Sequence, residues 1–457
     1  MSTTETERHT HAAATPHEAP IAGASPDGSV TDQSFADIER IDLSSPDYLE
    51  HAHQRYEAMR AKCPVSQAIF TASEGVEDQR FFNRPIWMVT DYEEGSRALL
   101  DRAITVAATS VLSEEQLAQM PEMPEEFKPL ARNILTIDPP EHTRLRKLVQ
   151  PSFTASTIEK LRPRIQQITD ELLNAVEAKA AARGERAPDR TMELIAQFSY
   201  PLPVTVNCEM LGIPPEDQEQ TRLWSENLLS EQTPERQDET RRNIGKFIAY
   251  LRNLFAQKRE TPGDDLTSQL LQVEVEGDRL TDDEILAMVF VLFVAGHITT
   301  VNLIANGVFA LLSHPEQADA LRRDSSLVPN AVEEILRYYG PAETTTPRLA
   351  HEDVELGGQT IARGETLLVV LAAADRDPTR FADPQAFDIT REGANRHIAF
   401  GKGVHACLGA PLARLEGQIA VETLFRRYPE LRLAVPHDEI TWAPSFLRSL
   451  TGLPLCF

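Results

Sequence analysis

The residues best placed to do chemistry surround Cys407, in a segment of the chain at 400–409 that reads FGKGVHACLG. Gly401 and Gly403 allow the backbone to turn tightly and to approach a bulky group closely. Apolar residues recur at helical spacing after Cys407, so the sequence places this cysteine at the N-terminus of a helix that runs to about residue 427. Free N–H groups and the helix dipole favour a thiolate there. A stable thiolate beside open backbone is an axial ligand suited to haem iron.

Two other interpretations of this loop stay open on the residues alone. Gly401-x-Gly403-x-x-Ala406 also satisfies the dinucleotide-binding pattern, with Glu422 in the position of its acidic residue. That pattern needs a βαβ unit, and a helix that runs to about residue 427 leaves little chain for the following strand. This alternative corresponds to a nicotinamide dehydrogenase. The plain alternative is a small cysteine packed at a turn.

The loop matches the signature Phe-Gly-x-Gly-x-His-x-Cys-x-Gly at every fixed position, and the chain therefore resembles the cytochrome P450 family, in its soluble bacterial branch. The resemblance covers roughly residues 40–457. It implies a mainly α fold with a small β portion, a single large domain at 41–457 built around a long central helix and haem b. It also implies that Cys407 binds the iron as a thiolate, and that Phe400 and Gly401 contact the haem.

Further motifs of the family occur in order along the chain. His142-x-x-x-Arg146, which follows Asp-Pro-Pro, resembles the helix that binds the haem propionates. The resemblance assigns two more propionate contacts, to Arg348 and His405. Physically, propionates drawn into an apolar core need cations or N–H donors, and the planar fork of arginine suits carboxylates.

Glu334-x-x-Arg337 resembles the Glu-x-x-Arg helix of the family, which with Arg391 would form a buried ion network behind the haem loop. By itself such a pair carries no information, because Glu–Arg pairs at this spacing are common on exposed helices. The assignment therefore rests on the resemblance.

Residues 295–300 read AGHITT and resemble the oxygen-activation motif of the family. We expect Gly296 to open a pocket for dioxygen, Thr299 to orient the water that delivers protons, and Thr300 to belong to the same catalytic group. Ile298 stands where the family usually has an acid, and isoleucine cannot relay a proton. Either Thr299 with ordered water suffices, or His297 substitutes, or the oxygen chemistry is less coupled. The alternative is a notch for helix packing.

The position of the motifs predicts a substrate pocket with a mostly apolar lining, which implies a hydrophobic small molecule such as a terpenoid, a polyketide or a fatty-acid-like compound. The alternative is that several of these residues are ordinary core. The expected lining is Leu135, Val291, Val294, Ala295, Thr344, Phe446 and Leu447.

The elements that must position these residues are mostly helices between about residues 45 and 340. The sequence predicts helices at 156–182 and 236–260, and a long, buried one that starts with the capping box Thr281-x-x-Glu284 and continues to about Ser313. Strands are predicted at 85–90, 354–356 and 365–370.

Composition sets limits on partners and compartment. The 457 residues carry a net charge of −25, and so acidic a chain is an unlikely partner for nucleic acid. Its four cysteines are too few for a disulfide scaffold and suit a reducing cytoplasm. Residues 1–40, poor in large apolar side chains, are expected to be a disordered tail without a signal peptide. The most apolar run, 285–296, is shorter than the roughly 20 residues of a bilayer span, so no membrane association is expected.

The resemblance implies a monooxygenase that inserts one oxygen atom from O2 into its substrate. Nothing in the chain resembles a flavin or nicotinamide domain, so we expect electrons from a separate ferredoxin and ferredoxin reductase. Two alternatives share the cofactor: a peroxide-driven or otherwise atypical haem-thiolate enzyme, and a non-catalytic haem sensor. A basic patch near the Cys407 loop is expected to attract the ferredoxin, made of Arg144, Lys147, Lys402, Arg426 and Arg427.

Overall fold

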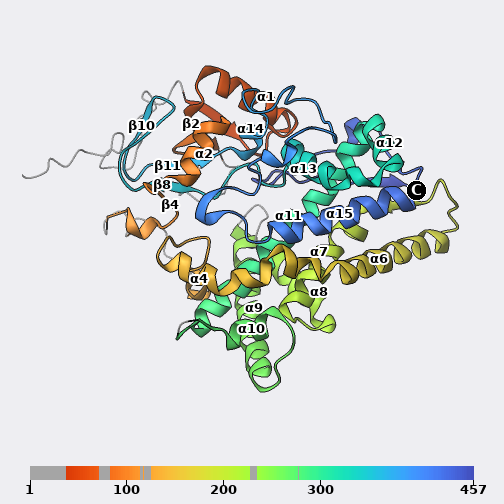
Figure 1. The fold of residues 1–457 in the computed structure, drawn as a ribbon, viewed down its shortest axis with the longest axis horizontal. Coiled ribbons are helices and arrows are strands. Elements are labelled where there is room, and N and C mark those ends of the chain that lie inside the picture. Colours follow the sequence, from red (N-terminus) through yellow and green to blue (C-terminus); the bar gives the residue numbers. More distant parts are fainter. Residues whose placement is uncertain (1–37, 72–82, 114–116, 118–124, 227–233, 276) are drawn as a thin grey trace, which may run out of the picture. The chain divides into compact units, whose positions relative to one another are not determined.

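The computed structural model of the protein describes residues 38–71, 83–113, 117, 125–226, 234–275 and 277–457. The predicted tail at 1–40 lies almost entirely outside the described residues. Residues 40–457 cluster as one unit, and the expected mainly α fold with a small β portion is confirmed (Figure 1).

The predicted central helix is α11 (Asp282–Ser313), and it begins with the expected capping box. The Thr281 side chain accepts a hydrogen bond from the Glu284 N–H, and the Glu284 carboxylate accepts one from the Thr281 N–H at 2.8 Å. The helix contacts α7 (Pro201–Leu211), α13 (Val328–Tyr339) and α15 (Ala410–Arg427). Length and composition alone would let α11 cross a membrane, but over half of its most apolar window is buried inside the protein. It is therefore the core helix of the fold.

The predicted helix at 156–182 is interrupted, which corrects that expectation. It consists of α5 (Ala155–Glu159) and α6 (Arg162–Ala182). Pro163 has no N–H to donate to the carbonyl four residues earlier, so it is tolerated in the first turn of a new helix and not inside a continuous one. The remaining helices are α1 (Pro46–Lys62), α2 (Tyr92–Leu100), α4 (Glu141–Val149), α8 (Pro215–Glu226), α9 (Pro234–Glu260), α10 (Leu266–Gln272), α12 (Pro315–Arg323) and α14 (Leu371–Ala374).

The main sheet has six strands in the order β1-β2-β3-β11-β8-β4. Strand β11 pairs parallel with β3, with Leu367 opposite Trp87, and antiparallel with β8, which begins at Arg348. The three predicted strands are confirmed as β3, β9 and β11. The strands are β1 (Glu39–Asp42), β2 (Val65–Thr71), β3 (Pro85–Val89), β4 (Ile104–Thr105), β5 (Thr191–Glu193), β6 (Glu274–Val275), β7 (Asp278–Arg279), β8 (Arg348–Ala350), β9 (Val354–Leu356), β10 (Gln359–Ile361), β11 (Thr366–Val369), β12 (Arg432–Leu433) and β13 (Pro454–Cys456).

Candidate active site

The Cys407 loop is a tight turn held against α2. The Cys407 N–H donates to the Phe400 carbonyl at 2.8 Å, and both Gly401 and Gly403 have positive φ, 68° and 74°. A Cβ on Gly403 would lie 2.5 Å from the Leu99 carbonyl oxygen. Because that oxygen belongs to backbone, only glycine fits at this contact.

The Cys407 sulfur lies just before α15, as predicted. Burial raises the pKa of the thiol, while N–H groups of Gly409 and Ala410 and the charges of Arg146 and Arg414 act in the opposite direction. The side chain nevertheless keeps accessible surface. The backbone N–H groups of Gly409 and Ala410 hydrogen-bond to its sulfur. This is the donor environment that a metal-bound thiolate needs.

Donors predicted to meet the propionates gather around this loop. His142 and Arg348 are buried, and within the described residues both His142 ring nitrogens and the Arg348 Nε have no hydrogen-bond partner. The rings of His142 and His405 lie 4.3 Å apart, centroid to centroid. Arg146 ties α4 to the loop by donating to the carbonyls of residues 404 and 406, at 3.0 and 2.7 Å.

This cluster fits a group that carries carboxylates. Burial, together with the neighbouring His405 and Arg146, lowers the pKa of His142 to about 4. Burial likewise lowers the pKa of the Arg348 guanidinium. Unpartnered buried donors are costly, and two propionates would supply the missing acceptors. The residues present therefore fit haem b.

Asp138 is a member of the cluster to which the sequence assigned no role. Its carboxylate accepts from His405 Nε2 at 2.9 Å and from the backbone N–H groups of Val106 and Ala107 at 3.0 and 3.1 Å, and the Thr105 hydroxyl donates to it as well. Burial opposes ionisation, yet these hydrogen bonds hold the pKa of Asp138 well below its usual range. Asp138 thus orients His405, and the only sequence signal was its place directly before Pro139.

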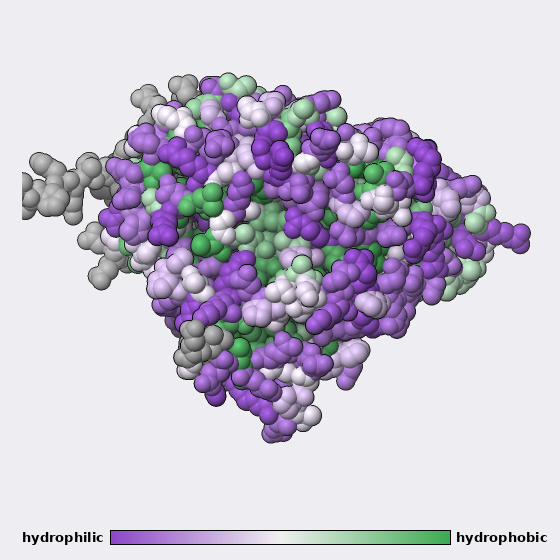
Figure 2. All heavy atoms as spheres, viewed as in Figure 1, coloured by the Kyte–Doolittle hydropathy of each residue, from purple (hydrophilic) through white to green (hydrophobic). Residues whose placement is uncertain are grey.

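One face of α11 lines a hollow. Much of the helix is fully buried, yet seven residues in its middle keep accessible surface. Five of them recur at helical spacing along one face, four of these five are apolar, and Leu292 and Gly296 lie beside that face. Apolar atoms are also visible in a recess at the centre of the face drawn in Figure 2, surrounded by hydrophilic side chains. The five residues of this accessible stripe are Val291, Val294, Ala295, Ile298 and Thr299.

Thr299 is the polar member of the stripe. Its hydroxyl donates to the Ala295 carbonyl at 2.9 Å, which leaves the oxygen lone pairs able to accept from a water in the hollow. Ile298 occupies the same face and adds an apolar, non-titratable side chain. The polar chemistry of this face is therefore concentrated in one hydroxyl.

Gly296 faces α7, and Thr300 is buried within α11. A Cβ on Gly296 would lie 2.5 Å from Nδ2 of Asn207 in α7, so the space that the glycine opens is filled by that amide. Thr300 is buried, and its hydroxyl donates to the Gly296 carbonyl at 3.2 Å. Gly296 keeps some accessible surface beside the stripe, so its role at a dioxygen pocket stays a prediction, whereas Thr300 has almost none.

His297 does not replace the missing acid in the hollow. Its side chain is fully buried, its Nδ1 hydrogen-bonds to the Phe293 carbonyl at 2.7 Å, and its ring packs against Tyr200. Burial lowers the pKa of His297, so the imidazole is neutral at pH 7. Of the three sequence alternatives for proton supply, this one is disfavoured.

The structure brings together Glu334, Arg337 and Arg391. Arg337 forms a two-bond pair with the Glu334 carboxylate at 2.7 Å for each bond, and Arg391 Nε lies 3.1 Å from both oxygens. Both arginines also donate to the carbonyl of Ala386. The network ties α13 to the chain segment that leads into the Cys407 loop.

The remaining predicted pocket residues lie in loops. Thr344, Phe446 and Leu447 are partly buried, and a β-bridge between Ala342 and Leu447 sets their two segments side by side. Leu135 is 41% exposed in the loop before α4.

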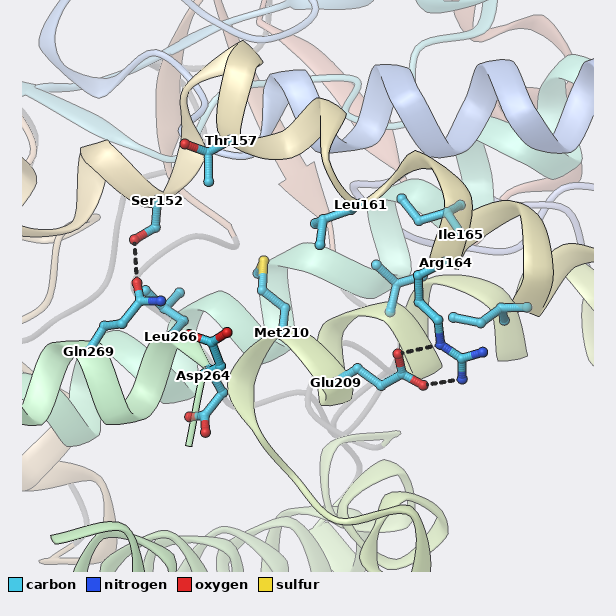
Figure 3. A pocket seen from close by; sticks show the side chains of 13 residues that line it. Ser152, Thr157, Leu161, Arg164, Ile165, Glu209, Met210, Asp264, Leu266 and Gln269 are labelled. Atoms are coloured by element: carbon cyan, nitrogen blue, oxygen red, sulfur yellow. Dashed lines mark hydrogen bonds and ion pairs between the residues drawn. The ribbon is translucent and has the colours of Figure 1, made fainter. Parts of the chain in front are cut away.

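A separate cavity of about 280 Å³ lies between α5, α6, α7 and α10, and Figure 3 shows the Arg164–Glu209 ion pair at its edge. None of the predicted haem or substrate residues lines it.

Among the described residues, no group of three or more His, Cys, Asp or Glu could hold a metal ion. A single cysteine ligand with a porphyrin remains the arrangement that these side chains support.

Comparison with known proteins agrees with this site. Residues 106–440 match the family model "Cytochrome P450". The chain is 44% identical to cytochrome P450 107B1 of Saccharopolyspora erythraea, over 89% of this chain and 95% of that one, and 38% identical to the 6-deoxyerythronolide B hydroxylase of the same organism, over 91% and 98%. The crystal structure of the myxobacterial cytochrome P450 CYP267B1 in complex with myristic acid is 39% identical, with a TM-score of 0.81 over 91% of this chain and 98% of that one. The chain therefore belongs to the cytochrome P450 family of oxidoreductases, whose cofactor is thiolate-ligated haem b.

Proposed function

We propose that this protein is an O2-dependent monooxygenase of the cytoplasm that inserts one oxygen atom into a hydrophobic small molecule, by hydroxylation or epoxidation. The observation that carries this proposal is the accessible stripe of α11, because it presents one hydroxyl, Thr299, within an otherwise apolar surface facing a hollow. Such a surface binds an apolar substrate and excludes water except where a hydroxyl holds it.

Each predicted residue has a physical task in this proposal. Cys407 is the iron ligand, Phe400 and Gly401 support the turn beneath the haem, and the buried donors around His142 hold its propionates. Haem bound in this way supplies the redox chemistry that activates dioxygen. Thr299 orients the water that supplies protons, and its neighbours on α11 contact the substrate.

The substrate class is proposed from the stripe together with the relatives. The named relatives include a vitamin D(3) 25-hydroxylase of Pseudonocardia autotrophica and the polyketide biosynthesis cytochrome P450 PksS of Bacillus subtilis. Those names describe reactions on bulky, largely apolar molecules. We extend the same class to this chain, with Leu135, Thr344, Phe446 and Leu447 completing the lining.

Electrons are proposed to come from a separate ferredoxin and its reductase. In the basic patch expected to attract that partner, four of the five cations contact other groups of this protein. Arg144 pairs with Glu284, Arg426 with Glu422, and Arg427 with Glu177, while Lys402 donates to Tyr92 and Ser96 of α2.

The test is a spectrum followed by turnover. Reduced protein with carbon monoxide should give the Soret band of a thiolate-ligated haem, and Cys407→Ala should lose it. Compounds that displace the iron-bound water then identify ligands, and these are incubated with NAD(P)H, ferredoxin and reductase under 18O2. One 18O atom in the product supports the proposal, whereas unlabelled product or a spectrum typical of histidine ligation contradicts it.

Ile298 favours one second candidate, a peroxide-driven enzyme, because an apolar residue replaces the usual acid of the proton supply. The same ligands are incubated with hydrogen peroxide in place of O2 and ferredoxin. Faster product formation with peroxide than with the complete electron-transfer system would favour this candidate.

A further inference from the structure

Asn207 of α7 is a buried amide pressed against the middle of α11, away from the accessible stripe. Only 2% of its surface is exposed. Its Nδ2 donates to the carbonyls of Leu292 and Phe293, at 3.4 and 3.3 Å. Both neighbours are carbonyl oxygens, so only the nitrogen end of the amide can face them. Gly296 makes the approach possible, because a Cβ there would lie 2.5 Å from Nδ2 and 3.0 Å from Oδ1.

Stability does not explain this amide. Both hydrogen bonds are longer than the usual 2.7–3.2 Å, so they are weak. A buried amide that bonds weakly does not recover the free energy of its desolvation. A leucine of similar size would satisfy the same contact between apolar helices without that cost.

The Asn207 amide acts on a turn of α11 in which other side chains already donate to the backbone carbonyls. The Phe293 carbonyl also accepts from His297 Nδ1, and the carbonyls of Ala295 and Gly296 accept from the hydroxyls of Thr299 and Thr300. In an α-helix each of these carbonyls also accepts from the N–H four residues later. A shared acceptor bonds each donor more weakly, so side chains loosen the helix just before Thr299.

We propose that Asn207 is a positioning residue for oxygen activation. By sharing the Leu292 and Phe293 carbonyls it keeps this turn loosely bonded, so that the Ala295 carbonyl and the Thr299 hydroxyl can turn towards a water in the hollow. The device compensates for the absence of an acid at Ile298. The inference rests on the proposed monooxygenase function, and it reaches Thr299 from the opposite face of the helix.

The first test is Asn207→Leu, which removes the donor and keeps the volume. Hydrogen–deuterium exchange of the Gly296 and His297 amides, measured without substrate or partner, should slow several-fold, because the Leu292 carbonyl is then no longer shared with Asn207 and the Phe293 carbonyl loses one of its two side-chain donors. The thermal midpoint should stay equal or rise. Peroxide released per NAD(P)H consumed should at least double with a surrogate ferredoxin and reductase.

A matched control is Asn306→Leu, a second buried asparagine contact of α11. Asn306 Nδ2 donates to the Arg448 carbonyl at 2.8 Å, a hydrogen bond of normal length. This variant should lower the thermal midpoint and leave the peroxide ratio unchanged. If Asn207→Leu instead behaves like this control, with a lower midpoint and faster exchange, Asn207 is an ordinary packing residue and the inference is wrong.

A paired substitution separates packing from positioning. Gly296→Ala places its Cβ against the amide and should lower the thermal midpoint, and Gly296→Ala with Asn207→Ala should recover it. We expect the double variant to remain uncoupled, because the donor is still missing. Recovery of coupling together with stability would overturn the inference.

If the wild-type chain forms no product, the proposed function fails. Slowed amide exchange in Asn207→Leu would still decide whether the Asn207 amide loosens the turn.

Discussion

Ile298 and Thr299 are neighbours on the accessible stripe, and a pair of variants distinguishes their tasks. Thr299→Ala removes the only hydroxyl of the stripe, so electrons should be diverted to hydrogen peroxide. General acid–base steps are typically worth about 10²–10⁴-fold in rate, which makes the loss measurable. Ile298→Glu restores a titratable group on the same face and should leave coupling equal or better. The measurement is product and peroxide per NAD(P)H. Full coupling in Thr299→Ala would show that its hydroxyl does not position the water.

Glu416, to which the sequence analysis assigned no role, leads to a prediction about how the stability of the protein depends on pH. It is fully buried in α15, one of its carboxylate oxygens has no partner among the described residues, and burial raises its pKa to about 8 from 4.5. Between about pH 4.5 and 8, the Glu416 carboxyl is protonated in the folded protein and ionised in the unfolded chain. The free energy of unfolding must therefore fall as pH rises through this range. At about 1.4 kcal/mol per pKa unit, the loss amounts to several kcal/mol.

Glu416→Gln replaces the protonated acid by a neutral group of the same shape and should remove this loss. Thermal midpoints of the two proteins should nearly agree at pH 5 and separate by pH 8.5, with the variant more stable. Parallel midpoints across that range would show that the carboxyl is not neutral in the folded protein.

Single residues also show where sequence reasoning ends. Cys407, His142 and Arg348 could be found because a shared motif fixes both residue type and spacing. Asn207 and Asp138 could not, because their importance depends on which groups they face across a helix contact or a loop. Gly296 illustrates the same limit. The sequence predicts that it opens a pocket for dioxygen, with a helix-packing notch as the alternative, and it does not say which element faces the glycine.

At the scale of elements, Gly403 tests how the Cys407 loop is held to α2. Alanine there adds two costs: a left-handed backbone at φ 74° and a Cβ 2.5 Å from the Leu99 carbonyl. The backbone cost alone is about 1–2 kcal/mol. Gly358 in the β9–β10 turn has φ 76°, and no described atom beyond its chain neighbours lies within 4 Å of the place that an added Cβ would take. Gly358→Ala therefore isolates the backbone cost.

We expect Gly403→Ala to lower stability clearly more than Gly358→Ala and to reduce the haem content after purification. The measurements are the thermal midpoint and the ratio of Soret to protein absorbance. Equal losses in the two variants would show that the loop moves away from α2 freely, so that the contact does not fix the position of Cys407.

Elements were more predictable than their contacts. Periodicity and the capping box located α11, and short strand-like segments located β3 and β11, because those patterns reflect local backbone geometry. The break between α5 and α6 was missed although Pro163 marked it, since the apolar spacing continues across the break. The pairing of β3 with β11, far apart in the chain, has no local signal, and it is this pairing that joins the sheet in which Arg348 begins β8.

At the scale of the whole molecule, charge decides how a redox partner approaches. The chain carries a net charge of −25. The sequence suggested a local basic patch, yet four of its five cations contact carboxylates or hydroxyls of this protein. Arg427, for example, donates to the Glu177 carboxylate at 2.8 Å, and Lys402 to the Ser96 hydroxyl at 2.8 Å. The three arginines paired with carboxylates therefore produce little net field beyond their partners, whereas the neutral hydroxyls leave the charge of Lys402 in place.

The long-range field around the molecule should therefore repel an acidic ferredoxin, and salt should screen that repulsion. The Debye length falls from about 30 Å at 0.01 M to about 8 Å at 0.15 M ionic strength. We expect the rate of haem reduction by limiting acidic ferredoxin to stay constant or rise over this range. Lys402→Met should change the rate by the same factor at both ionic strengths, because Lys402 acts through its contact with α2 and not through steering. The measurement is stopped-flow reduction under carbon monoxide. A rate that falls several-fold with salt in the wild-type protein, and loses that dependence in Lys402→Met, would show that a basic patch steers the partner after all.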